Sequence, residues 1–318
     1  MKTLFNLTTD AYDLLRFRDS TDMENALAGF DGLELMVCGP DDRDILHPGF
    51  VEGLHMSLFG CWLDFWNGDR SAVLKEFDTE ENVRSCFGGT NPMALVRKFR
   101  EDLDHAEAYG AEYVVFHVSD CTTEEVFTRR FRHTDREVIR GACQILNLLF
   151  EDRQTGPMLL LENLWYPGLD FTNPEMTELL MDGIRYPNKG IMLDTGHLLH
   201  TDWTIRTQQE GLAYIHRQLD AHGDLVKWVR GVHLNQSLTG EYMRRIAAHP
   251  PEMKDTYQER QWQLLEYVIR SDAHKPFTCS GIEDLIRRID PDYLVFEFIT
   301  RNRAEHRQAL WIQQQALR

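Results

Sequence analysis

The feature that most constrains the fold is a set of eight short apolar runs, spaced along the whole chain and separated by longer amphipathic stretches. Most runs are nearly continuous in apolar residues, as in strands buried on both faces of a parallel sheet. Strands that alternate with helices eight times predict an α/β protein, a single (β/α)8 TIM barrel. The runs are Leu4–Thr9, Leu33–Val37, Val51–Ser57, Tyr113–Ser119, Met158–Asn163, Gly190–Asp194, Val229–Asn235 and Tyr293–Ile299.

Several helices between these runs have recognisable first residues. Asn91-Pro92 and Asn173-Pro174 each place a capping side chain before a proline at the first helical position. Thr207–Glu210 and Ser280–Glu283 have the spacing of a capping box. The expected helices are about Pro92–Tyr109, Asp135–Phe150, Pro174–Gly183, Thr207–His222, Lys254–Arg270, Ile282–Ile289 and Arg303–Ala316.

Two connections are longer than the others, Leu58–Gly89 and Ser237–Asp255. In a barrel both follow strands and therefore lie on the C-terminal face, where loops shape the active site. A two-domain doubly wound protein is the alternative, but the chain contains neither GxGxxG nor GxxxxGK[ST]. It also contains no Pro/Gly/Ser-rich linker. One barrel is therefore the preferred interpretation.

Composition excludes several classes of protein. The 318 residues include 51 acidic and 34 basic side chains, a formal charge of −17, so a uniform basic surface for nucleic acid or anionic membrane is absent. No stretch approaches the ~20 apolar residues of a membrane span. Asp10 and Asp13 interrupt the N-terminus too early for a signal peptide. The six cysteines are far apart and form no CxxC pair, which favours reduced thiols and a cytoplasmic location.

Polar residues at the ends of the apolar runs are the informative exceptions. Because the carboxyl ends of parallel barrel strands meet at one mouth, these side chains are expected to converge. Several carboxylates in one apolar cavity require a cation, and a divalent metal is the simplest one. Asp, Glu and His donors suit Zn²⁺, Mn²⁺, Co²⁺ or Fe²⁺. The residues are His55, His117, Glu162, Asp194, His197, His233 and Glu297.

Each of these residues also has a structural interpretation. A lone histidine such as His55 is more often a hydrogen-bonded core residue than a ligand. Glu162 and Glu297 are explained equally by pairing with arginine, and Asp194 by capping the helix that follows it. Such explanations are needed separately at six or more strand ends, whereas one metal site explains them all. The metal site is therefore preferred.

An aromatic string follows the third run. Phe59, Trp62, Phe65 and Trp66 have near-helical spacing, which is typical of packing. In a loop over a barrel mouth the same residues form the wall of a substrate pocket. We expect a pocket lined by Trp62, Phe65 and Trp66, together with the two asparagines Asn163 and Asn235 at strand ends.

Four segments carry a resemblance to a known family: LLLENLW, IMLDTGHLLH, GVHLNQS and VFEF. They resemble the xylose-isomerase-like TIM barrel superfamily, which joins sugar isomerases and epimerases to endonuclease IV. The resemblance implies one domain over residues 1–318. It also implies a shared divalent metal held by Glu162, Asp194, His233 and Glu297.

The endonuclease IV branch uses further ligands for a trinuclear zinc cluster, and this chain is similar there too. His55 and His117 match the histidines that hold a second metal with the bridging glutamate, here Glu162. His197 with Asp272-Ala-His274 resembles the ligands of a third metal. The 39-residue interval from His233 to Asp272 is longer than in the endonucleases. Some sugar isomerase-like members also carry Asp-x-His-x-Pro, as this chain does. The resemblance implies one to three ions of Zn, Mn or Co per chain.

The preferred activity is a sugar or sugar phosphate isomerase or epimerase. The metal stabilises an enediolate, Glu162 and Glu297 exchange the proton as base and acid, and His197 orients the substrate hydroxyl. The acidic chain favours a small molecule over nucleic acid, as does the segment after His55, FGCWLDFWNGD, which lacks basic side chains for gripping a duplex.

Two other functions stay open. An endonuclease IV-like multinuclear zinc phosphodiesterase would use all nine donors, including Asp272 and His274. A non-catalytic sugar- or metal-binding barrel is the second alternative, and the completeness of the donor set argues against it. A homo-oligomer is compatible with the sequence, and no membrane partner is expected.

Overall fold

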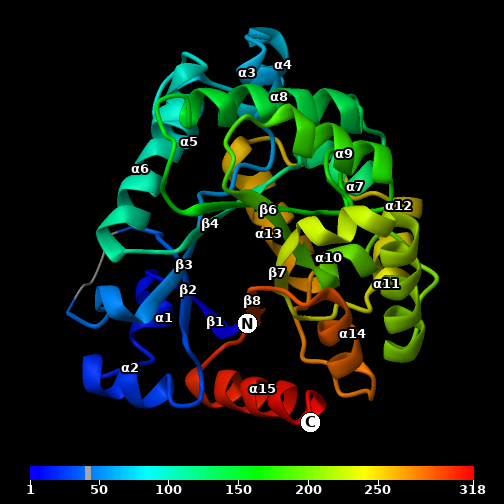
Figure 1. Ribbon diagram of the computed structural model, residues 1–318. Coiled ribbons are helices and arrows are strands. Elements are labelled where there is room, and N and C mark those ends of the chain that lie inside the picture. The colour runs from blue at the N-terminus through cyan, green and yellow to red at the C-terminus, as the bar shows by residue number, and fades with distance from the viewer. Residues whose placement is uncertain (40–43) are drawn as a thin grey trace.

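The computed structural model describes residues 1–39 and 44–318. Its eight strands are all parallel, and each pairs with the next in sequence, β8 closing on β1. This closed barrel confirms the expected (β/α)8 fold, with strands at the centre and helices around them (Figure 1). The strands are β1 (Lys2–Thr8), β2 (Gly32–Met36), β3 (Val51–His55), β4 (Tyr113–His117), β5 (Met158–Glu162), β6 (Lys189–Asp194), β7 (Val229–His233) and β8 (Tyr293–Phe296).

All seven helices expected from the sequence are present, with ends that differ by a few residues. Those seven are α6 (Met93–Tyr109), α8 (Asp135–Leu149), α9 (Pro174–Gly183), α11 (Gln208–His222), α13 (Tyr257–Ser271), α14 (Ile282–Ile289) and α15 (Arg303–Ala316). Thr207 and Glu210 form the expected capping box. The box expected at Ser280 is wrong. Gly281 occupies the N-cap of α14 with φ +95°, and it has no side chain to accept a hydrogen bond.

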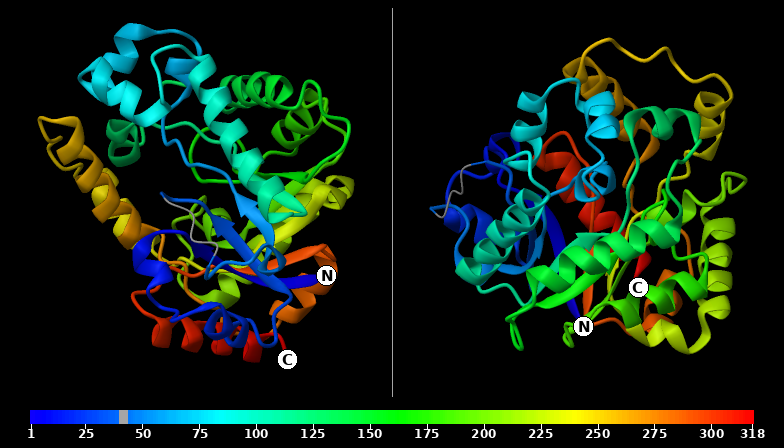
Figure 2. Two further views of the ribbon diagram at one scale, coloured as in Figure 1. Left: turned by 90° about the vertical axis from the view of Figure 1, so that its left-hand side faces the viewer. Right: turned by 90° about the horizontal axis from the view of Figure 1, so that it is seen from above.

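The sequence did not predict the shorter helices. They are α1 (Ala11–Leu14), α2 (Ser20–Ala26), α3 (Leu63–Trp66), α4 (Arg70–Phe77), α5 (Glu80–Phe87), α7 (Thr123–Thr128), α10 (Thr195–Leu199) and α12 (Gly240–Ala248), with 3₁₀ helices η1 (Pro48–Phe50) and η2 (Gly223–Trp228). The long connection after β3 contains α3–α5, and the one after β7 contains α12. Both lie on the side of the barrel away from the N-terminus, which is the C-terminal face (Figure 2).

These two connections contact each other beyond the mouth. Asp78, after α4, accepts hydrogen bonds from the backbone N–H of Tyr257 (2.6 Å) and from Arg260 Nη2 (2.6 Å) of α13. The mouth of the barrel is therefore flanked by two linked excursions of the chain.

Apolar side chains fill both faces of the strands, which explains why the runs are nearly continuous. Leu33 and Leu35 of β2 join the core between strands and helices. Their neighbour Glu34 therefore faces the barrel interior, which is otherwise packed with apolar and aromatic side chains such as Tyr113 and Val115. Within the described part of the chain, no helix combines the length and the apolar character needed to cross a membrane.

Candidate metal centre

The nine residues predicted as metal ligands lie together at the C-terminal ends of the strands. Six end a strand or directly follow one, and His197, Asp272 and His274 come from the loops and helices that continue the chain. Eight of the nine side chains are at most 13% exposed, and His117 is 20% exposed. They form three groups: His55, His117 and Glu162; Glu162, Asp194, His233 and Glu297; and His197, Asp272 and His274.

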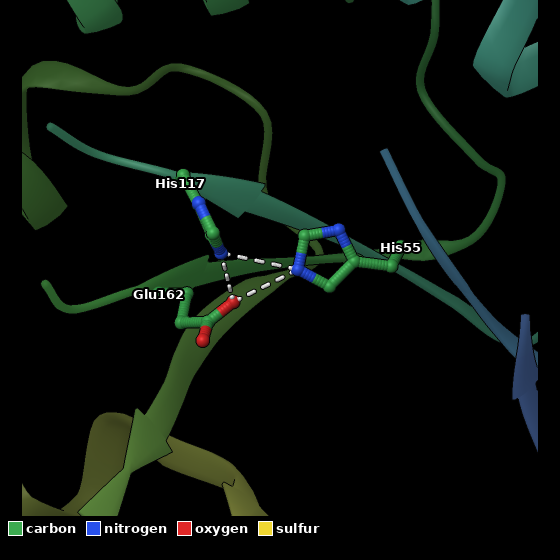
Figure 3. A group of neighbouring side chains, drawn as sticks. All are labelled: His55, His117 and Glu162. Atoms are coloured by element: carbon green, nitrogen blue, oxygen red, sulfur yellow. Dashed lines mark hydrogen bonds and ion pairs between the residues drawn. The ribbon is translucent and has the colours of Figure 1, made fainter. Parts of the chain in front are cut away.

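In the first group two imidazoles point at one carboxylate oxygen (Figure 3). Glu162 Oε2 lies 2.9 Å from His117 Nε2 and 3.1 Å from His55 Nε2. His55 Nδ1 lies 2.9 Å from the backbone carbonyl of Met56, which only accepts, so Nδ1 carries the proton. Neutral His55 therefore turns a bare Nε2 toward a carboxylate, and two acceptors at this distance require a cation.

In the second group the other oxygen of Glu162 is shared with further donors. Glu162 Oε1 lies 3.1 Å from His233 Nδ1, and Glu297 Oε2 approaches the same nitrogen at 3.3 Å. Asp194 Oδ2 is 3.9 Å from it. Three carboxylates and one imidazole nitrogen thus surround one point, a donor set suited to a divalent ion.

The third group repeats the arrangement of the first. His197 Nδ1 lies 2.9 Å from the carbonyl of Asn163, so this nitrogen carries the proton. Its Nε2 faces Asp272 Oδ2 at 3.2 Å, and His274 Nε2 lies 2.9 Å from the same oxygen. Neither ring nitrogen of His274 has a hydrogen-bond partner among the described residues.

The two asparagines expected in the substrate pocket instead hold Asp194. Asn163 Oδ1 accepts from the backbone N–H of Asp194 (2.8 Å), and Asn235 Nδ2 donates to Asp194 Oδ2 (2.7 Å). Both side chains are fully buried. Gly196 makes this packing possible, because a Cβ there would lie 1.9 Å from Asn235 Oδ1. The asparagines position a ligand rather than line a pocket.

The aromatic residues expected in the pocket also lie elsewhere. Trp62 is 2% exposed, and its Nε1 donates to the carbonyl of Ser119. Phe65 stacks on Phe87 of α5 with ring centroids 4.1 Å apart. Trp66 Nε1 donates to Gln144 of α8. The near-helical spacing of these residues therefore reflects packing of α3 against α5 and α8.

Sequence reasoning missed Glu34. Its carboxylate lies 2.9 Å from His233 Nε2, and the Tyr113 hydroxyl donates to it at 2.8 Å. Gly53 leaves room for the Tyr113 ring, because a Cβ there would lie 2.0 Å from it. Histidine ligands are commonly oriented by such a carboxylate on the nitrogen opposite the metal. The only signal in the sequence was a single acidic residue within an otherwise apolar run.

The electrostatics of the three groups fit a divalent cation. Among residues 1–39 and 44–318, no Lys or Arg pairs with Glu162, Asp194, Asp272 or Glu297. Burial alone would lower the pKa of His274, but Asp272 and Glu297 outweigh burial and raise this pKa to about 9. Burial raises the pKa of Glu297 to about 7. The carboxylates therefore draw protons onto their neighbours, and a bound metal ion would supply the same positive charge.

Comparisons with solved structures agree with the fold. Endonuclease IV from Thermus thermophilus is 17% identical with a TM-score of 0.54, covering 100% of this chain and 99% of that one. A D-tagatose 3-epimerase-like protein is 16% identical with a TM-score of 0.52, covering 100% and 97%. The IolI protein with a bound zinc atom is 12% identical with a TM-score of 0.54, covering 99% and 96%. At these identities the likeness shows the fold alone.

Comparisons of sequence give a more specific result. No curated protein sequence matches this chain. The family model described as xylose isomerase-like TIM barrel, in contrast, matches residues 26–314, nearly the whole barrel. This chain therefore belongs to the xylose isomerase-like TIM barrel family.

Proposed function

We propose that this protein is a metal-dependent phosphodiester hydrolase with a multinuclear site. The observation that carries the proposal is the position of Glu162. Its Oε2 faces His55 and His117, and its Oε1 faces His233. A carboxylate placed in this way can join two metal ions, which suits hydrolysis of a phosphodiester better than a reaction at one ion.

The residues divide into two sets of ligands around that glutamate. His55 and His117 would hold one ion with Glu162. Asp194, His233 and Glu297 would hold the other. When bound, such ions lower the pKa of water and withdraw charge from phosphoryl oxygens. The protein keeps the donors in place through buried partners: a backbone carbonyl for His55, two asparagines for Asp194 and Glu34 for His233.

Two features of known structures are consistent with a metal-bound barrel of this kind. The IolI protein carries a zinc atom, and endonuclease IV has the same fold. The support for hydrolysis comes from the donor groups of this chain, because the identities are low.

A sugar isomerase or epimerase is the second candidate, and the pair Glu162 and Glu297 favours it. Both carboxylates approach His233 Nδ1, at 3.1 and 3.3 Å, so they flank one metal position. Burial raises the pKa of Glu297 to about 7, which suits a group that takes and returns a proton near neutral pH. In this case only the four-residue second group needs to hold a metal.

The experiment compares the two reactions on one zinc- or manganese-loaded preparation. Hydrolysis is measured with bis(p-nitrophenyl) phosphate and with an oligonucleotide duplex that contains an abasic site. Isomerisation is measured as deuterium uptake from heavy water into a panel of ketoses and their phosphates. Metal-dependent hydrolysis that is lost in Glu162→Gln supports the proposal. Deuterium uptake without hydrolysis would reject it in favour of the isomerase.

A further inference from the structure

His200 is a buried histidine next to the third donor group that none of the roles above uses. It follows α10, three residues after His197, and is 1% exposed. The Trp165 ring packs against it with centroids 4.4 Å apart, and the same ring contacts His197 at 5.0 Å. His200 therefore lies beside the group formed by His197, Asp272 and His274.

The hydrogen bonds of Thr239 decide which nitrogen of His200 carries a proton. The Thr239 hydroxyl donates to the carbonyl of Ser271, so its single proton is committed. Its oxygen lies 3.3 Å from His200 Nε2 and can only accept there. Nε2 is therefore the protonated nitrogen, and Nδ1 carries a lone pair.

This lone pair is buried and has no hydrogen-bond partner among the described residues. Nδ1 lies 4.0 Å from Asp272 Oδ1. Ser237 Oγ donates to that oxygen at 3.2 Å, while the other oxygen of Asp272 faces His197 and His274. A lone pair and a carboxylate do not attract each other, so a cation is the group that accounts for this pairing. Ligand atoms lie about 2.0–2.2 Å from zinc, so two atoms 4.0 Å apart can share one ion.

We propose that His200 is a fourth protein ligand, through Nδ1, of an ion held by His197, Asp272 and His274. Four protein ligands are typical of closed structural zinc sites, whereas catalytic sites keep an open position. The third ion then stabilises the mouth, and the groups that share Glu162 are left to act on the substrate. The inference rests on the third group holding a metal ion and does not depend on which reaction the protein catalyses.

The test counts zinc ions and measures their affinities on the full chain. Metal-free protein is titrated with Zn²⁺ against a chromophoric chelator, and bound zinc is measured by elemental analysis. His200→Gln removes the Nδ1 donor, while the Gln amide reaches the position of Nε2 and can still donate to Thr239. Thr239→Val is the matched control, because it removes that hydrogen bond and leaves Nδ1. Thermal unfolding of each metal-free variant establishes that it is folded.

We expect three ions in the wild type, with one of them bound at least tenfold more weakly in His200→Gln and nearly unchanged in Thr239→Val. Cobalt(II) gives a second readout, because four-coordinate cobalt absorbs more strongly than higher-coordinate cobalt, and this absorption should fall in His200→Gln. Three ions bound with wild-type affinity in His200→Gln would overturn the proposal. So would equal losses in both variants, or only two ions in the wild type. Failure to hydrolyse phosphodiesters with these affinities as expected would reject the proposed function alone.

Discussion

His233 is held between carboxylates on both of its ring nitrogens. Nε2 lies 2.9 Å from Glu34 Oε1 in the barrel interior, and Nδ1 lies 3.1 Å from Glu162 Oε1 at the mouth. Since the Tyr113 hydroxyl already donates to Glu34, that carboxylate is well placed to accept the Nε2 proton and leave Nδ1 for a metal. Tyr113, Glu34 and His233 thus form a buried relay that orients one ligand.

The first prediction concerns Glu34. Glu34→Ala should weaken zinc binding at the group containing His233 by about 10- to 100-fold, the usual cost of losing an outer partner of a histidine ligand. Glu34→Gln keeps an acceptor for the Nε2 proton and should cost less. Competition with a chelator measures both. Glu112→Ala is the control, since Glu112 also accepts from a tyrosine, Tyr293, but lies outside the donor groups. Wild-type affinity in Glu34→Ala would refute the role.

The second prediction concerns Glu162, which contacts both ligand groups. Glu162→Gln should weaken binding of two ions at once, by more than the roughly 100-fold typical of an outer partner. Phosphodiesterase activity should fall at least as far. Elemental analysis after dialysis gives the ion count. Glu76→Gln is a matched control, because Glu76 is also buried but accepts hydrogen bonds from Thr123 and belongs to none of the donor groups. Loss of a single ion in Glu162→Gln would contradict the shared carboxylate.

Removing the metal should lower thermal stability, because the buried carboxylates then lack a cation. An ion present at 100 times its Kd adds about 2.7 kcal/mol to the free energy of unfolding. For a chain of this size that corresponds to a fall in Tm of several degrees for each ion removed. Calorimetry before and after chelation, followed by zinc addition, measures the change. The same Tm with and without chelator would show that these sites hold no tightly bound ion.

The last prediction is a pH dependence away from the metal centre. Burial lowers the pKa of His306 on α15 to about 4, and its ring packs edge-on against Phe5. The unfolded chain therefore binds more protons than the folded one between about pH 6.5 and 4. Stability from this residue is complete above about pH 6.5 and is lost as the pH falls toward 4, by roughly 3 kcal/mol.

His306→Phe should remove this dependence, because Phe cannot take up a proton and His306 Nε2 has no partner to lose among the described residues. Urea unfolding at about pH 7 and about pH 4.5, on either side of the unfolded-state pKa, measures it. The variant should lose less stability than the wild type across that interval. Identical losses in the two proteins would contradict the assignment to His306.

The sequence by itself determined the barrel and the composition of its mouth. Strands buried on both faces need nearly continuous apolar runs, so eight such runs were recognisable without any tertiary information. Residues such as Glu162 and His233 were identified for the same reason, since a polar side chain at the end of a buried strand is costly unless it is used. Parallel strands end at one mouth, which predicted that these residues would converge.

Tertiary structure alone decided how the donors divide and which neighbours support them. Glu34 and His233 are 199 residues apart, and the role of Glu34 follows only from their contact across the barrel. The segment containing Trp62 and Phe65 packs against α5 and α8, so its aromatic residues leave the mouth. Local pattern records whether a side chain is buried, but which atoms it meets depends on distances between segments far apart in the chain. Those distances are set by barrel closure and by the packing of loops over the mouth.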